Sequence, residues 1–227
     1  MTPKPMRLAT AALLATIAAC TSAAPAATRT APQRSTPNPE DIAAMAKAKA
    51  DSAQYPYTEA DIHFMSGMIS HHAQAIVMAK LAPTHGASTS VRTLCDRIIN
   101  AQGDEIRLMS QWLRDRRLPV PEPDPRGMKM DMGGMEHTML MPGMLTDEQM
   151  RQLGAARGAD FDRLFLTGMI QHHQGAVTMV KELFDTYGAG QDQMIYKFAS
   201  DVQVDQTTEI TRMRQMLAYL VMNGHAP

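Results

Sequence analysis

Two stretches of this sequence carry the same pair of adjacent histidines between methionines. Residues 67–78 read GMISHHAQAIVM, and residues 168–179 read GMIQHHQGAVTM. Imidazole nitrogen and thioether sulfur both bind metals, and thioether favours soft ions such as Cu(I). The repeated pattern therefore suggests eight candidate metal ligands: Met68, His71, His72, Met78, Met169, His172, His173 and Met179.

The similarity between the two stretches extends beyond the histidines and indicates an internal duplication. Residues 64–80 and 165–181 share nine identities in seventeen positions without a gap, and QGDEIRLMSQWL (102–113) matches QTTEITRMRQML (206–217) more weakly. On a helical wheel, each of the latter segments places Gln, Glu and Met on one face. This face adds the candidate ligands Glu105, Met109, Glu209 and Met213, with Gln102 and Gln206 as hydrogen-bonding partners around them.

Burial of four histidines and two glutamates is costly unless they pair or coordinate an ion, so the duplicated faces predict a metal site. The alternative is that the methionines are core residues and that Glu or Gln satisfies each histidine pair across a helix interface.

A third feature is the methionine-rich segment GMKMDMGGMEHTMLMPGM, residues 127–144. Glycine and proline interrupt any helix here, so a helical core does not explain seven methionines. The segment resembles the copper-binding tracts of periplasmic copper-resistance proteins, whereas a low-complexity loop or an oxidant sink are the alternatives. We expect it to capture copper through Met128, Met130, Met132, Met135 and His137.

The donor types favour copper, and Cu(I) in particular, over other metals. Thioether and imidazole without a thiolate cluster suit copper, whereas zinc seldom takes thioether. A di-iron centre of the ferritin type needs a Glu-x-x-His pattern, and this chain has Gln-x-x-Glu instead. Zinc and iron are therefore the less favoured cofactors.

Apolar residues recur at three and four positions, and no segment shows convincing alternation, which predicts an all-α fold. We expect long helices near 59–81, 88–117, 159–186 and 191–223, with capping patterns at Thr58/Asp61 and Thr146/Gln149. The second pattern opens a short helix that ends near Gly158, and residues 118–145 are expected to be irregular. The hairpins 55–117 and 147–227, joined by a linker at 118–146, predict one antiparallel four-helix bundle over 55–227.

The N-terminus reads as an export signal. Lys4 and Arg7 precede an apolar run that is too short to span a membrane and that ends in IAAC, with Cys20. This resembles a bacterial lipoprotein signal, which predicts a signal peptide at 1–19, a lipidated Cys20 and a flexible tether over 20–54. An ordinary secretory signal cleaved near residues 23–27 is the alternative. We expect an exported protein, anchored by lipid to a membrane of the cell envelope.

The rest of the sequence narrows the function by what it lacks. A net charge of −1 gives no reason to expect nucleic acid as a partner. No nucleophilic triad, phosphate-binding loop or second transmembrane span is apparent, which disfavours hydrolases, nucleotide-dependent enzymes and transporters. Cys95 is expected to be a small buried residue without a disulfide, His63 and His85 to be solvated, and His225 to lie in a frayed tail.

The paired motifs FMSGMISHHAQAIVMAK and FDRLFLTGMIQHHQGAVTMVK, with QGDEIRLMSQWL, resemble the bacterial domain of unknown function 305 family. The resemblance implies a ferritin-like four-helix bundle, and copper binding in some exported members. Our main hypothesis is an exported protein that buffers, sequesters or hands over copper without turnover, to a copper chaperone or efflux partner. A ferritin-like metallo-oxidase and a metal-free helical interaction module are the alternatives, and the oligomeric state stays open.

Overall fold

The computed structural model describes residues 57–131, 133–134 and 136–224, which all fall in one compact unit, Ala43–Pro227. The expected signal peptide, Cys20 and the tether lie outside the described residues, as do Met132, Met135 and His225. Within the described ranges, no helix has an apolar stretch long enough to cross a membrane.

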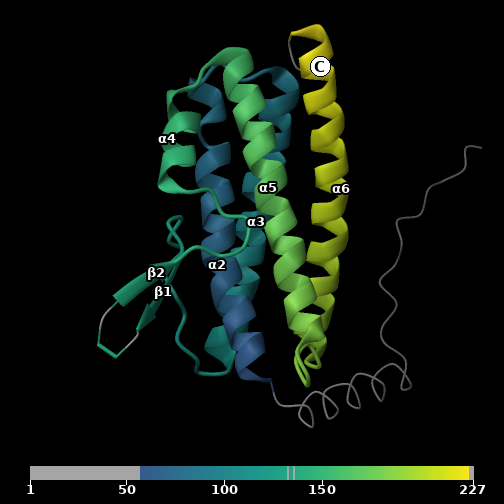
Figure 1. The fold of residues 1–227 in the computed structure, drawn as a ribbon. Helices are drawn as coiled ribbons and strands as arrows, with labels where there is room; N and C mark the ends of the chain where they lie inside the picture. The colour runs from purple at the N-terminus through teal and green to yellow at the C-terminus, as the bar shows by residue number, and fades with distance from the viewer. Residues whose placement is uncertain (1–56, 132, 135, 225–227) are drawn as a thin grey trace, which may run out of the picture. The chain divides into compact units, whose positions relative to one another are not determined.

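Four long helices make up most of the described chain, which confirms the expected helical class (Figure 1). They are α2 (Glu59–Ala79), α3 (Thr89–Asp115), α5 (Gly158–Asp185) and α6 (Gln193–Asn223). A 3₁₀ turn, η1 (Ala82–Thr84), follows α2, and a short helix, α4 (Asp147–Ala155), precedes α5. These bounds lie within two residues of those expected for the four long helices.

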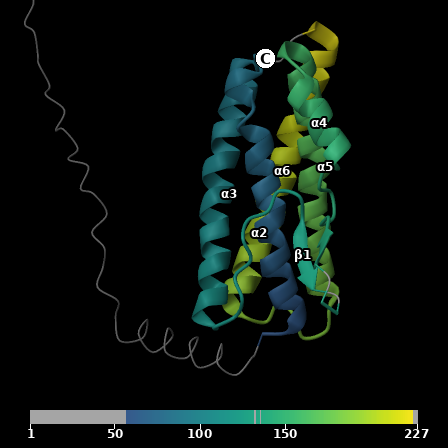
Figure 2. The ribbon, with the colours of Figure 1, turned by 90° about the vertical axis from the view of Figure 1, so that its left-hand side faces the viewer.

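The helices pack as two hairpins, α2 against α3 and α5 against α6, and the hairpins meet along α2 and α5 (Figure 2). Two glycines show how α2 and α5 meet. A Cβ added to Gly67 of α2 would contact Met179 of α5, and a Cβ added to Gly168 of α5 would contact Met78 of α2. The two helices therefore run antiparallel, and the duplicated motifs face each other across a pseudo-twofold axis.

Capping side chains fix where the helices begin. The boxes at Thr58/Asp61 and Thr146/Gln149 are both present, as the sequence predicted. Asp61 is fully buried and also accepts the Gly190 N–H at 2.8 Å, from the loop before α6. Such a bond satisfies a backbone donor and locks one hairpin onto the other.

The partner of Asp61 in the second repeat repeats this contact. Asp162 is 2 % exposed and its carboxylate accepts the Ser88 N–H at 3.2 Å, just before α3. Each hairpin thus ties down the loop that opens the outer helix of the other hairpin. Sequence reasoning missed this pair, although both aspartates occupy the same position of the repeat.

A small β-hairpin corrects the expectation that residues 118–145 are irregular. Strands β1 (Met128–Asp131) and β2 (Glu136–Met139) pair antiparallel next to α2 (Figure 1). The alternation of Met128 and Met130 with polar residues was the strand signal, because successive side chains of a strand point to opposite faces. Glycines 133 and 134 both have positive φ between the strands, which suits a turn.

The single tryptophan anchors the end of α3. Trp112 is fully buried, and its Nε1–H donates to Asp192 at 3.3 Å, while Arg116 stacks over the indole 4.2 Å from its centroid. Asp192 also caps α6 and pairs with Arg116 at 2.5 Å. This contact joins the end of one hairpin to the start of the outer helix of the other.

Candidate metal centre

Four imidazoles meet where α2 crosses α5, as the repeated motif predicted. His71 and His72 of α2 and His172 and His173 of α5 are all fully buried. The rings of His71 and His172 lie against each other, with centroids 3.7 Å apart and ring planes tilted by 38°. His72 and His173 lie to either side, 6.1 Å from His71 and 6.3 Å from His172 respectively.

The two central rings donate to backbone carbonyls. His71 Nε2–H donates to Pro142 O at 3.0 Å, and His172 Nε2–H donates to His71 O at 2.9 Å. A carbonyl can only accept, so each neutral ring carries its hydrogen on Nε2 and its lone pair on Nδ1. Burial, followed by the neighbouring imidazoles, holds the pKa of both rings well below its usual value. Both rings are therefore neutral at pH 7, which is the form that binds metals.

The two outer rings face carboxylates. His173 Nε2 donates to Glu209 Oε2 at 2.8 Å, and His72 Nε2 lies 2.7 Å from Glu105 Oε2. The His72–Glu105 contact is therefore close enough for an ion pair, but its geometry does not meet the criteria of a hydrogen bond. Both glutamates, predicted as direct ligands, thus occupy the outer side of a histidine ring in this structure.

In all four rings, Nδ1 is buried without a partner. Histidines that bind metals usually donate their other ring nitrogen to a carbonyl or carboxylate, which fixes the tautomer and the ring orientation. Such a hydrogen bond is present at His71, His172 and His173, and at His72 a carboxylate lies at ion-pair distance. The residues present therefore fit a metal bound through Nδ1.

The candidate ligands do not gather in a single complete set. Among the described residues, no group of three or more His, Cys, Asp and Glu side chains is close enough to hold one ion. The methionines predicted as ligands on the helices are buried in two apolar clusters, which the pseudo-twofold axis relates to each other. Met78, Met169 and Met213 belong to one cluster, and Met179, Met68 and Met109 belong to the other.

A cleft of about 420 Å³ lies between α3 and α6 and reaches the outer side of the histidine–glutamate pairs. Its lining includes three carboxylates, one arginine and two glutamines: Glu105, Asp205, Glu209, Arg97, Gln102 and Gln206. Gln102, 2 % exposed, has no partner for either amide atom, and Gln206, 4 % exposed, has none for Oε1. Burial, together with the charges of Glu105, Asp201 and Glu209, raises the pKa of Asp205. The cleft is a polar, negatively charged approach to the imidazoles.

The opposite side of the α2–α5 pair is covered by residues Met141–Leu145, which we call the strap. Gln74 holds it by donating to Leu145 O at 2.9 Å and by accepting the Leu145 N–H at 2.6 Å. The strap lies so close to α5 that a Cβ on Gly175 would be 1.9 Å from Pro142 O. Sequence reasoning missed the strap, and its signal was Gly175 at the position where the first repeat has Gln74.

The β-hairpin gathers part of the predicted capture segment on one face. Its register places Met128 opposite Met139 and Met130 opposite His137. Directly opposed side chains lie on the same face of an antiparallel pair, so these four form one methionine–histidine face. Met139 was not among the predicted ligands. His137 and Met139 are exposed, whereas Met128 and Met130 are half-buried.

Two further sequence expectations are settled by burial. His85 is buried rather than solvated, because Nε2–H donates to Gly154 O at 2.9 Å and Thr84 Oγ1 lies 2.9 Å from Nδ1. Cys95 is free and buried, as expected, and burial raises the pKa of its thiol to about 12.

The model of a family described as "Domain of unknown function (DUF305)" matches residues 61–217. The chain belongs to the DUF305 family. The match covers both histidine pairs, the α3–α6 cleft and the strap, so all of them lie within the DUF305 domain. No curated protein matches the chain.

Several solved structures resemble this DUF305 protein. A DUF305 protein from Streptomyces coelicolor, described as secreted, is 29 % identical, covers 74 % of this chain and 94 % of its own, and gives a TM-score of 0.57. A DUF305 fragment from Deinococcus radiodurans is 28 % identical over 73 % of this chain and 99 % of its own, with a TM-score of 0.59.

A third relative has been solved with metals. CopM in the Cu(II)-bound form is 30 % identical, covers 70 % of this chain and 96 % of its own, and gives a TM-score of 0.53. CopM has also been solved in Cu(I)-bound, silver-bound and metal-free forms.

Proposed function

We propose that this DUF305 protein is an exported copper-binding protein that holds copper in the cell envelope and hands it on without turnover. The observation that carries the proposal is the set of four buried imidazoles whose Nδ1 atoms lack partners. Leaving so many buried polar atoms unsatisfied is costly, and a soft metal ion would satisfy them. Cu(I) is the favoured state, because it accepts imidazole and thioether donors in low coordination numbers.

The relatives support the choice of metal. CopM, at about the same identity as the other relatives, was solved with Cu(II), Cu(I) and silver. Silver is a soft monovalent ion like Cu(I), so the same donor types would suit both. The paired hairpins support an antiparallel four-helix bundle of the ferritin-like type as the scaffold.

The proposal assigns different tasks to the predicted residues. His71, His172 and the outer rings bind through Nδ1, while Glu105 and Glu209 orient His72 and His173 as hydrogen-bond acceptors. The methionine–histidine face of the β-hairpin captures copper from solution. A lipid anchor at Cys20 would hold the protein near its copper donor or acceptor, and the secreted relative supports export.

The metallo-oxidase alternative keeps one observation in its favour. The α3–α6 cleft brings carboxylates to the histidine–glutamate pairs and opens to solvent, as a substrate channel would. An oxidase would show low, fixed stoichiometry and consumption of oxygen with turnover. A metal-free interaction module would show neither metal binding nor turnover.

The test is an anaerobic Cu(I) titration of residues 20–227, carrying Cys20→Ser, in competition with a chromophoric chelator. The double variant His71→Gln/His172→Gln keeps an amide N–H where Nε2–H donates and removes both Nδ1 atoms. We expect it to lose at least one equivalent of tightly bound Cu(I), whereas the control His225→Gln retains it. Equal binding by the double variant and the wild type would remove the imidazole layer from the proposal, and no binding by any form would refute the copper function.

A further inference from the structure

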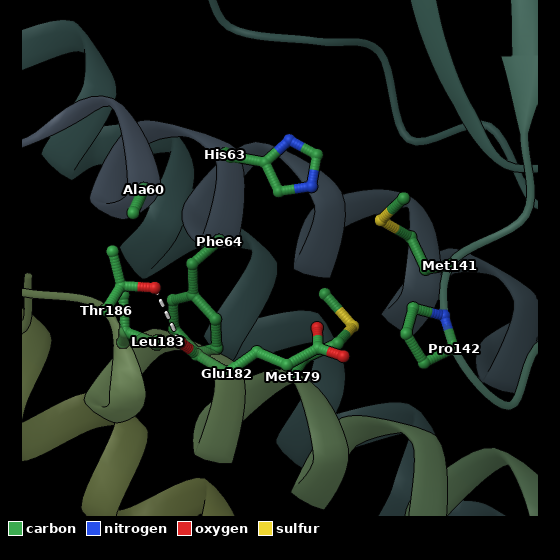
Figure 3. A pocket seen from close by; sticks show the side chains of 9 residues that line it. All are labelled: Ala60, His63, Phe64, Met141, Pro142, Met179, Glu182, Leu183 and Thr186. Atoms are coloured by element: carbon green, nitrogen blue, oxygen red, sulfur yellow. Dashed lines mark hydrogen bonds between the residues drawn. The ribbon is translucent and has the colours of Figure 1, made fainter.

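A small pocket of about 100 Å³ opens where the strap meets α2 and α5, and none of the four histidines of the imidazole layer lines it. Figure 3 shows His63 and Met141 on one side of it and Met179 and Glu182 on the other. Imidazole and two thioethers form a donor set for a soft ion. Of the three, only Met179 was a candidate ligand, and it had been assigned to the bundle interior.

The two sulfur side chains converge on one point of α2. A Cβ added to Gly67 would lie 2.5 Å from Met141 Sδ and 3.5 Å from Met179 Cε. His63 precedes Gly67 by four residues, so it lies one turn away on the same face of the helix. The helix, the strap and α5 thus each contribute one donor to the same pocket.

The donors are available for a ligand. Met141 N–H donates to Met144 Sδ at 3.3 Å, so the sulfur that is engaged within the strap belongs to Met144. The His63 side chain is exposed and makes no hydrogen bond within the described part of the chain. Met141 and Met179 are 3 % and 5 % exposed, which shields the sulfurs from bulk solvent while they border the pocket.

The duplicated half shows what this position looks like when it only needs packing. There, the pseudo-equivalent glycine, Gly168, faces Leu145 Cδ2 at 3.0 Å and Met78 Cε at 3.3 Å. The residues aligned with His63 and Glu182 are Leu164 and Leu81. Leucine therefore stands in place of His63, Met141 and Glu182, whereas Met179 has a methionine, Met78, as its counterpart. The polar, sulfur-rich composition of the pocket is not a requirement of the fold.

We propose that His63, Met141 and Met179 bind one soft monovalent cation, Cu(I) or Ag(I), at the surface, with Glu182 adding negative charge at the rim. This inference rests on the proposed function only in its choice of metal. Because the pocket is open to solvent and the imidazole layer is buried, it is a docking position from which copper can be loaded or exchanged.

The test uses Ag(I), which does not change oxidation state, as the probe. Met141→Leu/Met179→Leu keeps apolar volume, and such exchanges cost little stability in packed cores. We expect this variant to bind one equivalent of Ag(I) fewer than the wild type. The matched control Met216→Leu makes the same kind of exchange in the other apolar cluster, at a buried methionine that is not a candidate ligand, and should retain every equivalent. In the wild type, Ag(I) should shift the methyl resonances of Met141 and Met179 in ¹³C-methyl spectra.

A second variant does not depend on the core. His63 is exposed, so His63→Gln leaves the packing intact. The Ag(I) affinity of this variant should fall about tenfold or more, because removing even a hydrogen-bonding partner of a metal ligand costs that much. Unchanged stoichiometry in the double leucine variant, or unmoved methyl resonances, would overturn the proposal. His71→Gln/His172→Gln separates the two sites: it should keep the methyl shifts even if the imidazole layer binds nothing.

Discussion

Acidification should destabilise the metal-free protein through its two central histidines. Burial holds His71 and His172 neutral in the folded protein, with pKa values well below 6.5, whereas the unfolded chain takes up protons near that value. Above pH 6.5 the two rings are neutral in both states, so their burial does not lower the free energy of unfolding. As the pH falls below 6.5, protonation of the unfolded chain lowers the free energy of unfolding. The unfolded state then binds two protons that the folded state does not.

The size of the effect follows from this linkage. Between pH 7.5 and 5.5, each ring that stays neutral in the folded state lowers the free energy of unfolding by about 1.4 kcal/mol. The two rings together lower it by about 2.7 kcal/mol. Domains of this size have stabilities of about 5–15 kcal/mol, so the loss is a sizeable fraction. With a urea m-value of about 2 kcal/mol per M, the midpoint should move by roughly 1.4 M.

Urea unfolding followed by tryptophan fluorescence measures this directly, because the only tryptophan, Trp112, is fully buried. The wild type and His71→Gln/His172→Gln are compared from pH 7.5 to 5.5 in the presence of a copper chelator. Whatever its absolute stability, the double variant should lose about 2.7 kcal/mol less over this range, and each single variant about half of that. Titrating groups outside the imidazole layer are common to the variants and cancel in the difference.

Parallel stability profiles for the wild type and the double variant would refute the reasoning. They would mean that the rings are protonated in the folded state, or that they reach solvent in it. Either result would also weaken the case for Nδ1 as a ready metal ligand.

Further predictions concern the strap, the core and the β-hairpin. Gly175→Ala should destabilise the protein by about 1–3 kcal/mol in urea unfolding, because the added methyl group would overlap Pro142 O. As a control, the methyl group of Gly154→Ala in α4 meets nothing within 4 Å, so this substitution should stabilise the protein by up to about 1 kcal/mol. Equal effects of the two substitutions would show that the strap is not seated on α5. Cys95, with its pKa near 12, should resist a disulfide reagent at pH 8 until urea unfolds the chain, and a fast native reaction would contradict its burial. Met130→Leu/His137→Asn should remove weakly bound copper in the chelator competition without changing the urea midpoint, and unaltered stoichiometry would exclude the hairpin face from capture.

The helices and their starts could be predicted because the signals are local. Apolar residues at three- and four-residue spacing and the capping pairs at Thr58 and Thr146 act within a turn of helix, so the sequence alone locates them. The buried histidine pairs also followed from local spacing, since residues of one helix face share a period. Both predictions needed no knowledge of what packs against the helix.

The features that sequence reasoning missed depend on contacts between distant segments. The strap contacts Gln74 and Gly175, about 70 and 30 residues away, and nothing in MPGML itself shows where it lies. Likewise, the carbonyl of Pro142 decides which nitrogen of His71 is free. The hairpin was missed because glycine and methionine make a weak strand signal, and its shared face depends on register.

The strap also has an evolutionary consequence. Two identical hairpins assembled as a homodimer would have to place the same segment on both halves, or on neither. Joining the copies in one polypeptide removes that restriction, because the connecting segment occurs once and presents different residues to the two halves, Met141 to Gly67 and Leu145 to Gly168. The two halves can therefore differ: one has Leu81, Leu145 and Leu164 as packing residues, whereas the other has His63, Met141 and Glu182. A single polypeptide thereby allows a pseudo-symmetric scaffold to carry two chemically different ends.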